Sequence, residues 1–327
     1  MRICEINDIA SVASELADGL RARGHEVDVI RPRLIGGGLP WMVKPVVGPV
    51  RAVEWGQIIR QVRGGKYDAV HIHYAYLGMI GVLGNFPYLL HCHGSDVREI
   101  TPFTRPMVER ALVGASHVFY STPDLAPYVL PRRPDAEFLP NPINAEDFRP
   151  LAPARESRDV LVICSLTDIK GAVRIYQGVR RLAKERPEIR VTVIGGGEWT
   201  PRFAKLPNVT VLPHQPRAQL PALIARHGVV VGQVLLGVVG MAELEAMACA
   251  RPVIAWYTYN DAYPERPPFV RAVDGVEIAA SVIRFVDDAD ARERVGNEGR
   301  EWVRRYHKME HTAERVEAAA RHLLASR

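Results

Sequence analysis

The chain has 327 residues, 47% of them hydrophobic and 24% charged, a composition typical of a folded protein with one large or two ordinary domains. It contains no apolar run of about 18 residues, which argues against a membrane-spanning helix. Its first residues, M-R-I-C-E-I, predict a strand rather than a signal peptide. The net charge is +5, with 36 arginines and six lysines. Because the guanidinium group suits phosphate and carboxylate, we expect acidic ligands or an anionic membrane surface, and no nucleic acid.

Strands and helices alternate along the first half, the pattern of a parallel sheet covered by helices on both faces. The predicted strands are residues 2–6, 27–30, 69–73, 88–92, 117–120 and 137–140. The predicted helices are residues 10–23, 51–63 and 106–113. Residues 31–49 are predicted to be irregular, and residues 149–158, rich in proline, arginine and alanine, are predicted to form a linker.

The second half repeats this alternation. Its predicted strands are residues 160–164, 190–194, 209–212, 229–231 and 253–255. Its predicted helices are residues 171–185, 219–225, 278–285 and 291–306, a short helix that begins at Gly240, and a terminal helix from residue 309. Two α/β halves of this kind predict a ligand in the cleft between the carboxyl ends of their strands.

The helix that begins at Gly240 is the strongest single indication of a ligand site. Its N-terminal amides would point above the sheet, where they suit an anion. Glu243 and Glu245 are two residues apart and cannot share one helix face. We therefore expect one of them to point into the cleft and the other to meet solvent.

Six stretches, in this order, resemble the retaining glycosyltransferases of family 4, also called group 1 glycosyl transferases. They are L-A-D-G-L-R-A-R-G-H-E-V-D-V (16–29), H-G-S-D (93–96), P-N-P-I-N-A-E-D-F-R-P (140–150), K-G (170–171), V-I-G-G-G (193–197) and E-A-M-A-C-A-R-P-V-I-A (245–255). The resemblance implies the GT-B fold: an acceptor domain over residues 1–150, a nucleotide-sugar donor domain over 151–306, and a helix of about 307–327 that returns to the first. It also implies metal-independent transfer, with retained anomeric configuration, to a lipid or glycan acceptor.

The resemblance implies three catalytic residues: His93 beside the transferred sugar, Lys170 at the donor phosphates and Glu245 at the ribose hydroxyls. The residues expected to line the donor site are Lys170, Gly171, Gly195, Gly196, Gly197, Gly240, Glu243, Glu245 and Ser121. Each has a structural alternative, such as a solvated lysine, a tight glycine turn, a helix cap, a local salt bridge or a histidine bonded to backbone. Asp96 either orients His93 or caps the turn that follows it.

The chain departs from the family pattern at four places, three of them in the donor site. Asn7 and Asp8 stand where a glycine pair is usual, and Ser165 stands where an arginine contacts the pyrophosphate. Gly237 replaces the first of two glutamates, and the glycine-rich turn before residue 278 is largely missing. Arg174 could replace the missing charge, although a surface position is its alternative. Two other functions therefore stay open: a catalytically degenerate subunit that binds a partner or glycan, and a GT-B nucleotide-sugar epimerase.

The cysteines and histidines of the sequence do not form a recognisable metal-binding motif. The four cysteines are far apart, without metal-ligand spacing, which predicts reduced thiols in the cytoplasm. Two H-x-H pairs, His71 with His73 and His91 with His93, end predicted strands and place each pair on one sheet face. Imidazoles bind zinc well, but no acidic fourth ligand is evident, and no metal is assigned.

One apolar segment suggests a membrane-contact surface. Residues 39–50 contain Trp41, Met42 and several valines beside Lys44 and Arg51. An apolar patch rimmed by basic side chains suits an anionic membrane. We therefore expect either peripheral contact at the cytosolic face through residues 39–51, or a loop packed on its own domain.

Overall fold

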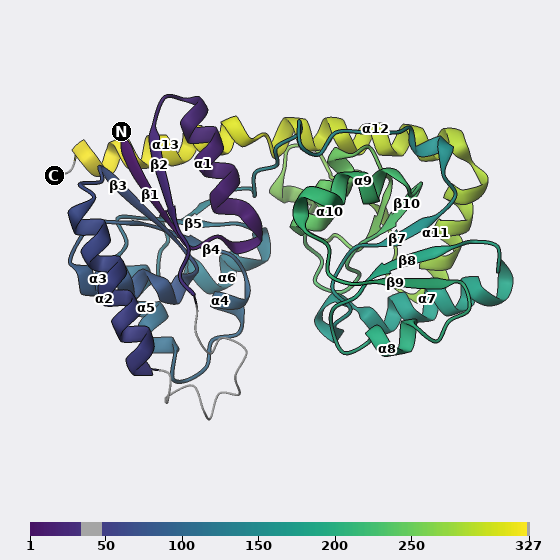
Figure 1. Ribbon diagram of the computed structural model, residues 1–327, viewed down its shortest axis with the longest axis horizontal. Coiled ribbons are helices and arrows are strands. Elements are labelled where there is room, and N and C mark those ends of the chain that lie inside the picture. Colours follow the sequence, from purple (N-terminus) through teal and green to yellow (C-terminus); the bar gives the residue numbers. More distant parts are fainter. Residues whose placement is uncertain (34–47, 326–327) are drawn as a thin grey trace. The chain divides into compact units, whose positions relative to one another are not determined.

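A computed structural model describes residues 1–33 and 48–325, which form two compact units (Figure 1). Unit 1 comprises Met1–Pro142 and Met309–Arg327, and unit 2 comprises Ile143–Lys308. Among the described residues, no helix has the length and apolar character that crossing a bilayer requires. Most of the apolar segment at residues 39–50 lies outside the described residues, so the membrane prediction stays a prediction.

Unit 1 is built on a parallel sheet of six strands in the order β2-β1-β3-β4-β5-β6. The strands are β1 (Arg2–Ile6), β2 (Glu26–Ile30), β3 (Ala69–His73), β4 (Leu89–Cys92), β5 (His117–Tyr120) and β6 (Glu137–Phe138). The helices are α1 (Val12–Ala22), α2 (Gly48–Gly64), α3 (Met79–Gly84), α4 (Ser95–Arg98), α5 (Arg105–Gly114), α6 (Ala126–Val129) and α13 (Met309–Ala325).

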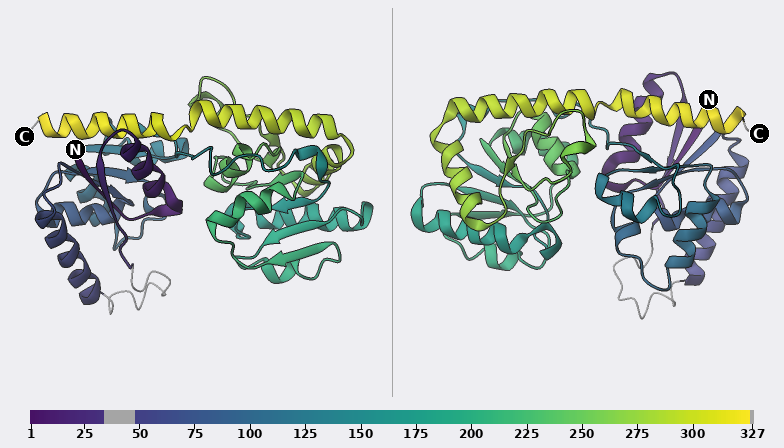
Figure 2. Two further views of the ribbon diagram at one scale, coloured as in Figure 1. Left: turned by 45° about the horizontal axis from the view of Figure 1, so that its top comes forward. Right: turned by 180° about the vertical axis from the view of Figure 1, so that it is seen from behind.

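Alternation along the strands of unit 1 separates two faces of the sheet. Cys4, Ile6, Ile72 and Leu90 face one way, into an apolar core that includes buried residues of α2, α3 and α5. The intervening residues face the other way, where α1 and α13 pack against each other. Figure 2 shows α13 lying along unit 1 near the N-terminus.

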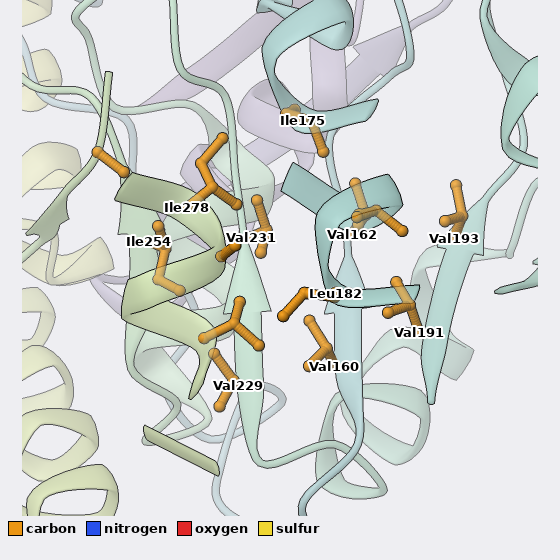
Figure 3. Close-up of a cluster of buried hydrophobic side chains, with 14 of the residues drawn as sticks. Val160, Val162, Ile175, Leu182, Val191, Val193, Val229, Val231, Ile254 and Ile278 are labelled. Atoms are coloured by element: carbon orange, nitrogen blue, oxygen red, sulfur yellow. The ribbon is translucent and has the colours of Figure 1, made fainter. Parts of the chain in front are cut away.

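Unit 2 has a second parallel sheet, in the order β12-β11-β10-β7-β8-β9. The strands are β7 (Val160–Val162), β8 (Val191–Ile194), β9 (Val209–Leu212), β10 (Val229–Val231), β11 (Val253–Ala255) and β12 (Val270–Arg271). The helices are α7 (Ala172–Glu185), α8 (Thr200–Phe203), α9 (Leu220–Ala225), α10 (Met241–Ala248), α11 (Gly275–Asp287) and α12 (Ala289–Tyr306). Figure 3 shows Ile175 and Leu182 of α7 and Ile278 of α11 packed over the valines of the central strands.

Most predicted elements coincide with observed ones to within a few residues, because long apolar periodicities identify them. The sequence does not predict β12 or the four-residue helices α4, α6 and α8. Elements this short carry too few residues to show a period.

The division into units falls earlier than the expected boundary at residue 150, because residues 143–148 pack with unit 2. The Ile143 N–H donates to the His307 carbonyl at 2.8 Å. The stretch predicted as a linker is also tied down: fully buried Arg251 donates to the Ala152 carbonyl at 2.8 Å, and fully buried Arg292 donates to the Ala154 carbonyl at 2.9 Å. These bonds fix residues 149–158 against their own unit.

Candidate functional site

The carboxyl ends of β7 and β10 form the topological switch point of unit 2. β10 and β8 flank β7 on opposite sides, so the loops that leave β7 and β10 diverge and leave a crevice, the usual ligand position in such sheets. The two loops meet there: the Val234 N–H donates to the Lys170 carbonyl at 3.0 Å. A Cβ on Gly171 would lie 2.8 Å from Val234 Cγ2, which is why only glycine fits.

Lys170 and Arg174 bring two positive charges to this edge. Lys170 ends the 3₁₀ turn Asp168–Lys170 directly before α7, and its ammonium makes no hydrogen bond or ion pair with another described residue. Arg174, one turn along α7, donates to the Val234 carbonyl at 3.0 Å and lies 5.8 Å from the Trp256 ring centroid. It is half-buried at the edge rather than on the open surface. Ser165 is exposed in the same loop.

The glycines that follow β8 support the loop that follows β7. The Gly196 carbonyl accepts from the Leu166 N–H at 2.7 Å, and a Cβ on Gly197 would lie 2.3 Å from the Leu166 oxygen. A Cβ on Gly195 would lie 3.0 Å from the Leu212 oxygen. Close backbone packing therefore accounts for Gly195 and Gly197, whereas Gly196 faces open space.

Glu243 and Glu245 are both buried, with 3% and 4% exposure, so the expectation that one meets solvent is wrong. Glu243 turns back under its own loop, where it accepts from the Gln233 N–H at 2.8 Å and fills the space above Gly240. Gly240 is the residue directly before α10, as predicted, and a Cβ there would lie 2.5 Å from Glu243 Oε2.

Glu245 accepts a charge-assisted hydrogen bond from Arg217 Nε at 2.7 Å. Arg217 comes from the loop after β9, and its guanidinium lies 4.7 Å from the Phe148 ring centroid. Glu245 therefore does form a salt bridge, but with a residue distant in the sequence rather than the local one that sequence reasoning left open. Arg217 itself escaped prediction, since nothing in its neighbourhood marks it as a partner of a residue 28 positions away.

The loop between β10 and α10 is organised by Gln233 and Gly237. The fully buried Gln233 side chain accepts from Leu236 N–H at 2.8 Å and donates to the Val238 carbonyl. Gly237 has φ of 73°, and a Cβ there would lie 2.6 Å from Thr258 Oγ1. The glycine is therefore required by the backbone, and a glutamate could not replace it without moving the loop.

The corresponding edge of unit 1 carries His93. The Asp96 carboxylate accepts from the backbone N–H groups of His93 at 3.1 Å, Gly94 at 2.6 Å and Ala75 at 2.8 Å. Burial nevertheless raises the pKa of Asp96, although these bonds lower it. Asp96 therefore holds the turn rather than the imidazole ring, the second of its two predicted roles.

The ring of His93 is held by its neighbours on β3. His93 Nε2 lies 2.9 Å from His73 Nδ1, and His73 Nε2 lies 2.6 Å from Glu5 Oε2. Desolvation, and then the neighbouring His73 and His71, hold the pKa of His93 well below its ordinary range. A neutral His93 can donate or accept a proton at a hydroxyl, whereas Glu5 and His73 set its orientation.

Ser121 lies next to this turn. Its N–H donates to the Cys92 carbonyl at 3.0 Å, and its buried hydroxyl makes no hydrogen bond with the described residues. The residue before the following 3₁₀ turn is Thr122, whose side chain makes no capping bond. The alternative of a helix cap therefore does not account for Ser121.

Asn7 and Asp8 occupy the loop after β1. Asn7 adopts a left-handed φ of 73° and donates from Nδ2 to the His73 carbonyl at 3.1 Å. Asp8 accepts from the Ser14 hydroxyl at 2.6 Å and from Arg31 Nη2 at 2.9 Å. These side chains fill the place where a glycine pair would leave the backbone open.

Two family models match the chain: a glycosyl transferase 4-like domain over residues 9–142 and a glycosyl transferase-like model over residues 174–318. Among solved structures, sucrose-phosphate synthase from Thermosynechococcus elongatus matches with a TM-score of 0.75 and 18% identity over 100% of both chains. A glycosyltransferase from Rickettsia africae matches with a TM-score of 0.70 and 13% identity, over 99% of this chain and 98% of its own. The catalytic domain of starch synthase IV from Arabidopsis thaliana, bound to ADP and acarbose, has a TM-score of 0.67 and 12% identity over 99% of both chains. A search of curated proteins finds no match.

Two six-stranded parallel sheets, each flanked by helices, in a chain that matches these structures over its whole length define the GT-B fold. The two family models together span both units, and the chain belongs to the family 4, or group 1, glycosyltransferases. The predicted fold and family are confirmed, and the protein is a glycosyltransferase.

Proposed function

We propose that this glycosyltransferase transfers a hexose-like sugar from a nucleotide-sugar donor to a lipid or glycan acceptor, with retention of anomeric configuration and without a metal at the donor phosphates. The observation that carries the proposal is that Lys170 and Arg174 both lie at the switch point of unit 2, where each is hydrogen-bonded to the backbone of Val234. The starch synthase structure, which matches this chain in fold, was solved with ADP bound.

Each site residue has a role in this proposal. Lys170 binds the departing diphosphate together with the first amides of α7, because a helix N-terminus attracts anions. Gly171 and Gly196 let the phosphates approach the backbone, and Arg174 supplies the charge that Ser165 lacks. Glu245, held by Arg217, accepts the ribose hydroxyls. In unit 1, the proposal assigns sugar binding to His93 and Ser121.

A direct test is isothermal titration with nucleoside diphosphates, beside transfer assays with nucleotide sugars and mixed lipid and glycan acceptors in EDTA. Lys170→Ala should weaken diphosphate binding by about tenfold or more, since charge-assisted bonds contribute about 1.5–3 kcal/mol. Glu185→Ala, which removes an exposed ion pair with Arg181 at the other end of α7, should bind as the wild type does. Equal affinity of Lys170→Ala and wild type would reject the donor site. Activity that requires an added divalent ion would reject metal independence.

A second candidate is a catalytically degenerate subunit that binds a partner or glycan. The Glu243 carboxylate, bonded inside its own loop, favours it because no carboxylate then replaces the one missing at Gly237. Diphosphate binding with neither donor hydrolysis nor transfer across the panel would support this candidate. An epimerised sugar nucleotide in the product mixture would support the third alternative, an epimerase.

A further inference from the structure

A carboxylate and three imidazoles occupy one face of the unit 1 sheet. In the register of the parallel strands, Glu5 of β1 lies opposite His71 of β3, and His73 lies opposite His91 of β4. Residues two apart on a strand share a face, and adjacent strands are about 4.8 Å apart, so the four side chains form one patch. All four are fully buried, with 0% exposure.

The distances within this buried cluster, Glu5, His71, His73 and His91, are short. Glu5 Oε2 lies 2.6 Å from His73 Nε2 and 2.9 Å from His71 Nδ1. One ring nitrogen from each of His71, His73 and His91 lies within 4.8 Å of the other two. The His91 ring centroid is 5.6 Å from that of His71 and 5.3 Å from that of His73. The three rings therefore converge on a common volume beside a carboxylate.

The cluster leaves polar atoms without hydrogen bonds. His71 Nε2, both ring nitrogens of His91, and Glu5 Oε1 have no hydrogen-bond partner among the described residues, whereas His71 Nδ1 lies 2.9 Å from Glu5 Oε2. A neutral imidazole has one N–H and one lone pair, and leaving such a group buried without a partner destabilises the fold. A cation would turn lone pairs of His71 and His91 into bonds, would replace one of the two contacts that His73 makes with Glu5 and His93, and would balance the charge of the carboxylate.

We propose that His71, His73 and His91 bind a divalent transition metal of the zinc type, with Glu5 as the neighbouring carboxylate. Three imidazoles and a carboxylate are a typical ligand set for zinc, and Zn–N bonds of about 2.1 Å place tetrahedral nitrogens roughly 3.4 Å apart. The rings would need to approach one another by at most about 1.4 Å from the 4.8 Å limit. The acidic ligand that the sequence pattern lacks is Glu5, which sheet pairing brings from 68 residues away.

A metal at this place would be structural. The ligands are fully buried, so no position is open to substrate, and the metal would join β1, β3 and β4 to one another. The site lies in unit 1, whereas the proposed donor phosphates bind in unit 2. His73 of this cluster also lies 2.9 Å from His93 Nε2, but the inference does not rest on the proposed function. A structural metal is compatible with transfer that survives chelation, because a buried metal exchanges slowly with a chelator.

The first measurement is the metal content of the tag-free full chain, expressed with zinc in the medium and dialysed against a weak chelator. We expect about one zinc per chain by mass-spectrometric elemental analysis. The metal-free chain, refolded after guanidinium and EDTA treatment, should bind Co²⁺ with the visible absorption of a tetrahedral site. Less than about 0.1 zinc per chain together with no such Co²⁺ spectrum would overturn the proposal.

The second measurement compares His91→Leu with His227→Leu, which removes a buried histidine of unit 2 that is hydrogen-bonded to Thr192. If the metal is bound, the zinc content of His91→Leu should be at least tenfold lower than that of wild type, and its melting temperature should be lower. The zinc content of His227→Leu should equal that of wild type. If the imidazole only lies buried without a partner, leucine should leave zinc content unchanged and raise the melting temperature or leave it unchanged. That result would overturn the proposal. Should His91→Leu fail to fold, the wild-type stoichiometry and Co²⁺ spectrum still decide the question.

Discussion

At the scale of single residues, the donor site of unit 2 shows how one departure from a sequence pattern constrains its neighbours. Gly237 is held at a left-handed φ against Thr258, so a glutamate at this position would need a different loop. Glu243 cannot replace it, because its carboxylate is bonded to the Gln233 N–H. Of the two glutamates of α10, Glu245 is therefore the candidate for ligand binding, because its partner Arg217 is itself partly exposed.

The first prediction concerns Glu245. Glu245→Ala should weaken nucleotide binding by more than about tenfold, because a buried carboxylate that accepts two hydroxyls contributes a few kcal/mol. Titration of a nucleoside diphosphate and of a non-hydrolysable donor analogue measures this. Glu185→Ala serves as the control, since its carboxylate forms an exposed ion pair elsewhere in unit 2. Unchanged affinity in Glu245→Ala would mean that the carboxylate only anchors Arg217.

At the scale of elements, one carboxylate joins α13 to α1 in a charge network, beside a close contact of small residues. Glu317 is 7% exposed and forms ion pairs with Arg23 of the α1 C-terminus, with His25 at 3.3 Å and with Arg321 at 2.6 Å. Gly19 permits the close approach, because a Cβ there would lie 2.9 Å from the Ala313 Cβ. The terminal helix is therefore held to unit 1 by a small-residue contact and a charge network.

This network predicts a dependence of stability on pH. Burial alone would raise the pKa of Glu317, but Arg23, Arg321 and His25 lower it from its ordinary 4.5 to about 2. A carboxylate whose pKa is lower in the folded state stabilises the fold above pH 4.5 and loses that contribution as the pH falls toward 2. The melting temperature of Glu317→Gln should lie below that of wild type at neutral pH. This difference should shrink as the pH falls from 4.5 to about 2.

The matched control is Glu310→Gln, at an exposed glutamate on the same helix. Its melting temperature should follow that of wild type at every pH. A difference between Glu317→Gln and wild type that persists unchanged to pH 2 would show that the network is not what the acid disrupts.

At the scale of the whole molecule, the chain has the fold and the family of a glycosyltransferase but an incomplete set of donor-site groups. Lys170 and Arg174 provide positive charge for a diphosphate, whereas Gly237 provides no carboxylate to bind the sugar. We therefore predict that the protein binds a nucleoside diphosphate well and discriminates poorly among its sugar conjugates.

Parallel titrations of one nucleoside diphosphate and several of its sugar conjugates measure this discrimination. The affinities should agree within about a hundredfold, which corresponds to less than roughly 2.8 kcal/mol of sugar recognition. The missing carboxylate should also slow transfer by roughly one to two decades, because a charge-assisted bond contributes about 1.5–3 kcal/mol and one decade corresponds to about 1.4 kcal/mol. A conjugate bound more than a hundredfold more tightly than the bare diphosphate would demonstrate a well-formed sugar pocket and contradict the prediction.

The sequence by itself determined the order of strands and helices and the place of each motif within them. Lys170 and Gly171 lie at the start of α7, Gly240 lies before α10, and His93 follows β4, all as predicted. These features are local: hydrophobic periodicity, a helix boundary or a glycine turn depends on residues within one or two turns of one another.

Only the tertiary structure decided which distant side chains meet. Glu5 faces His73 across 68 residues, Arg217 reaches Glu245 across 28, and Arg174 reaches Val234 across 60. Strand register and loop packing determine these contacts, and neither leaves a periodic signal in the chain. The same reason explains why the burial of both Glu243 and Glu245 escaped prediction: a helix pattern states which residues share a face, but the loops packed around α10 determine which faces meet water.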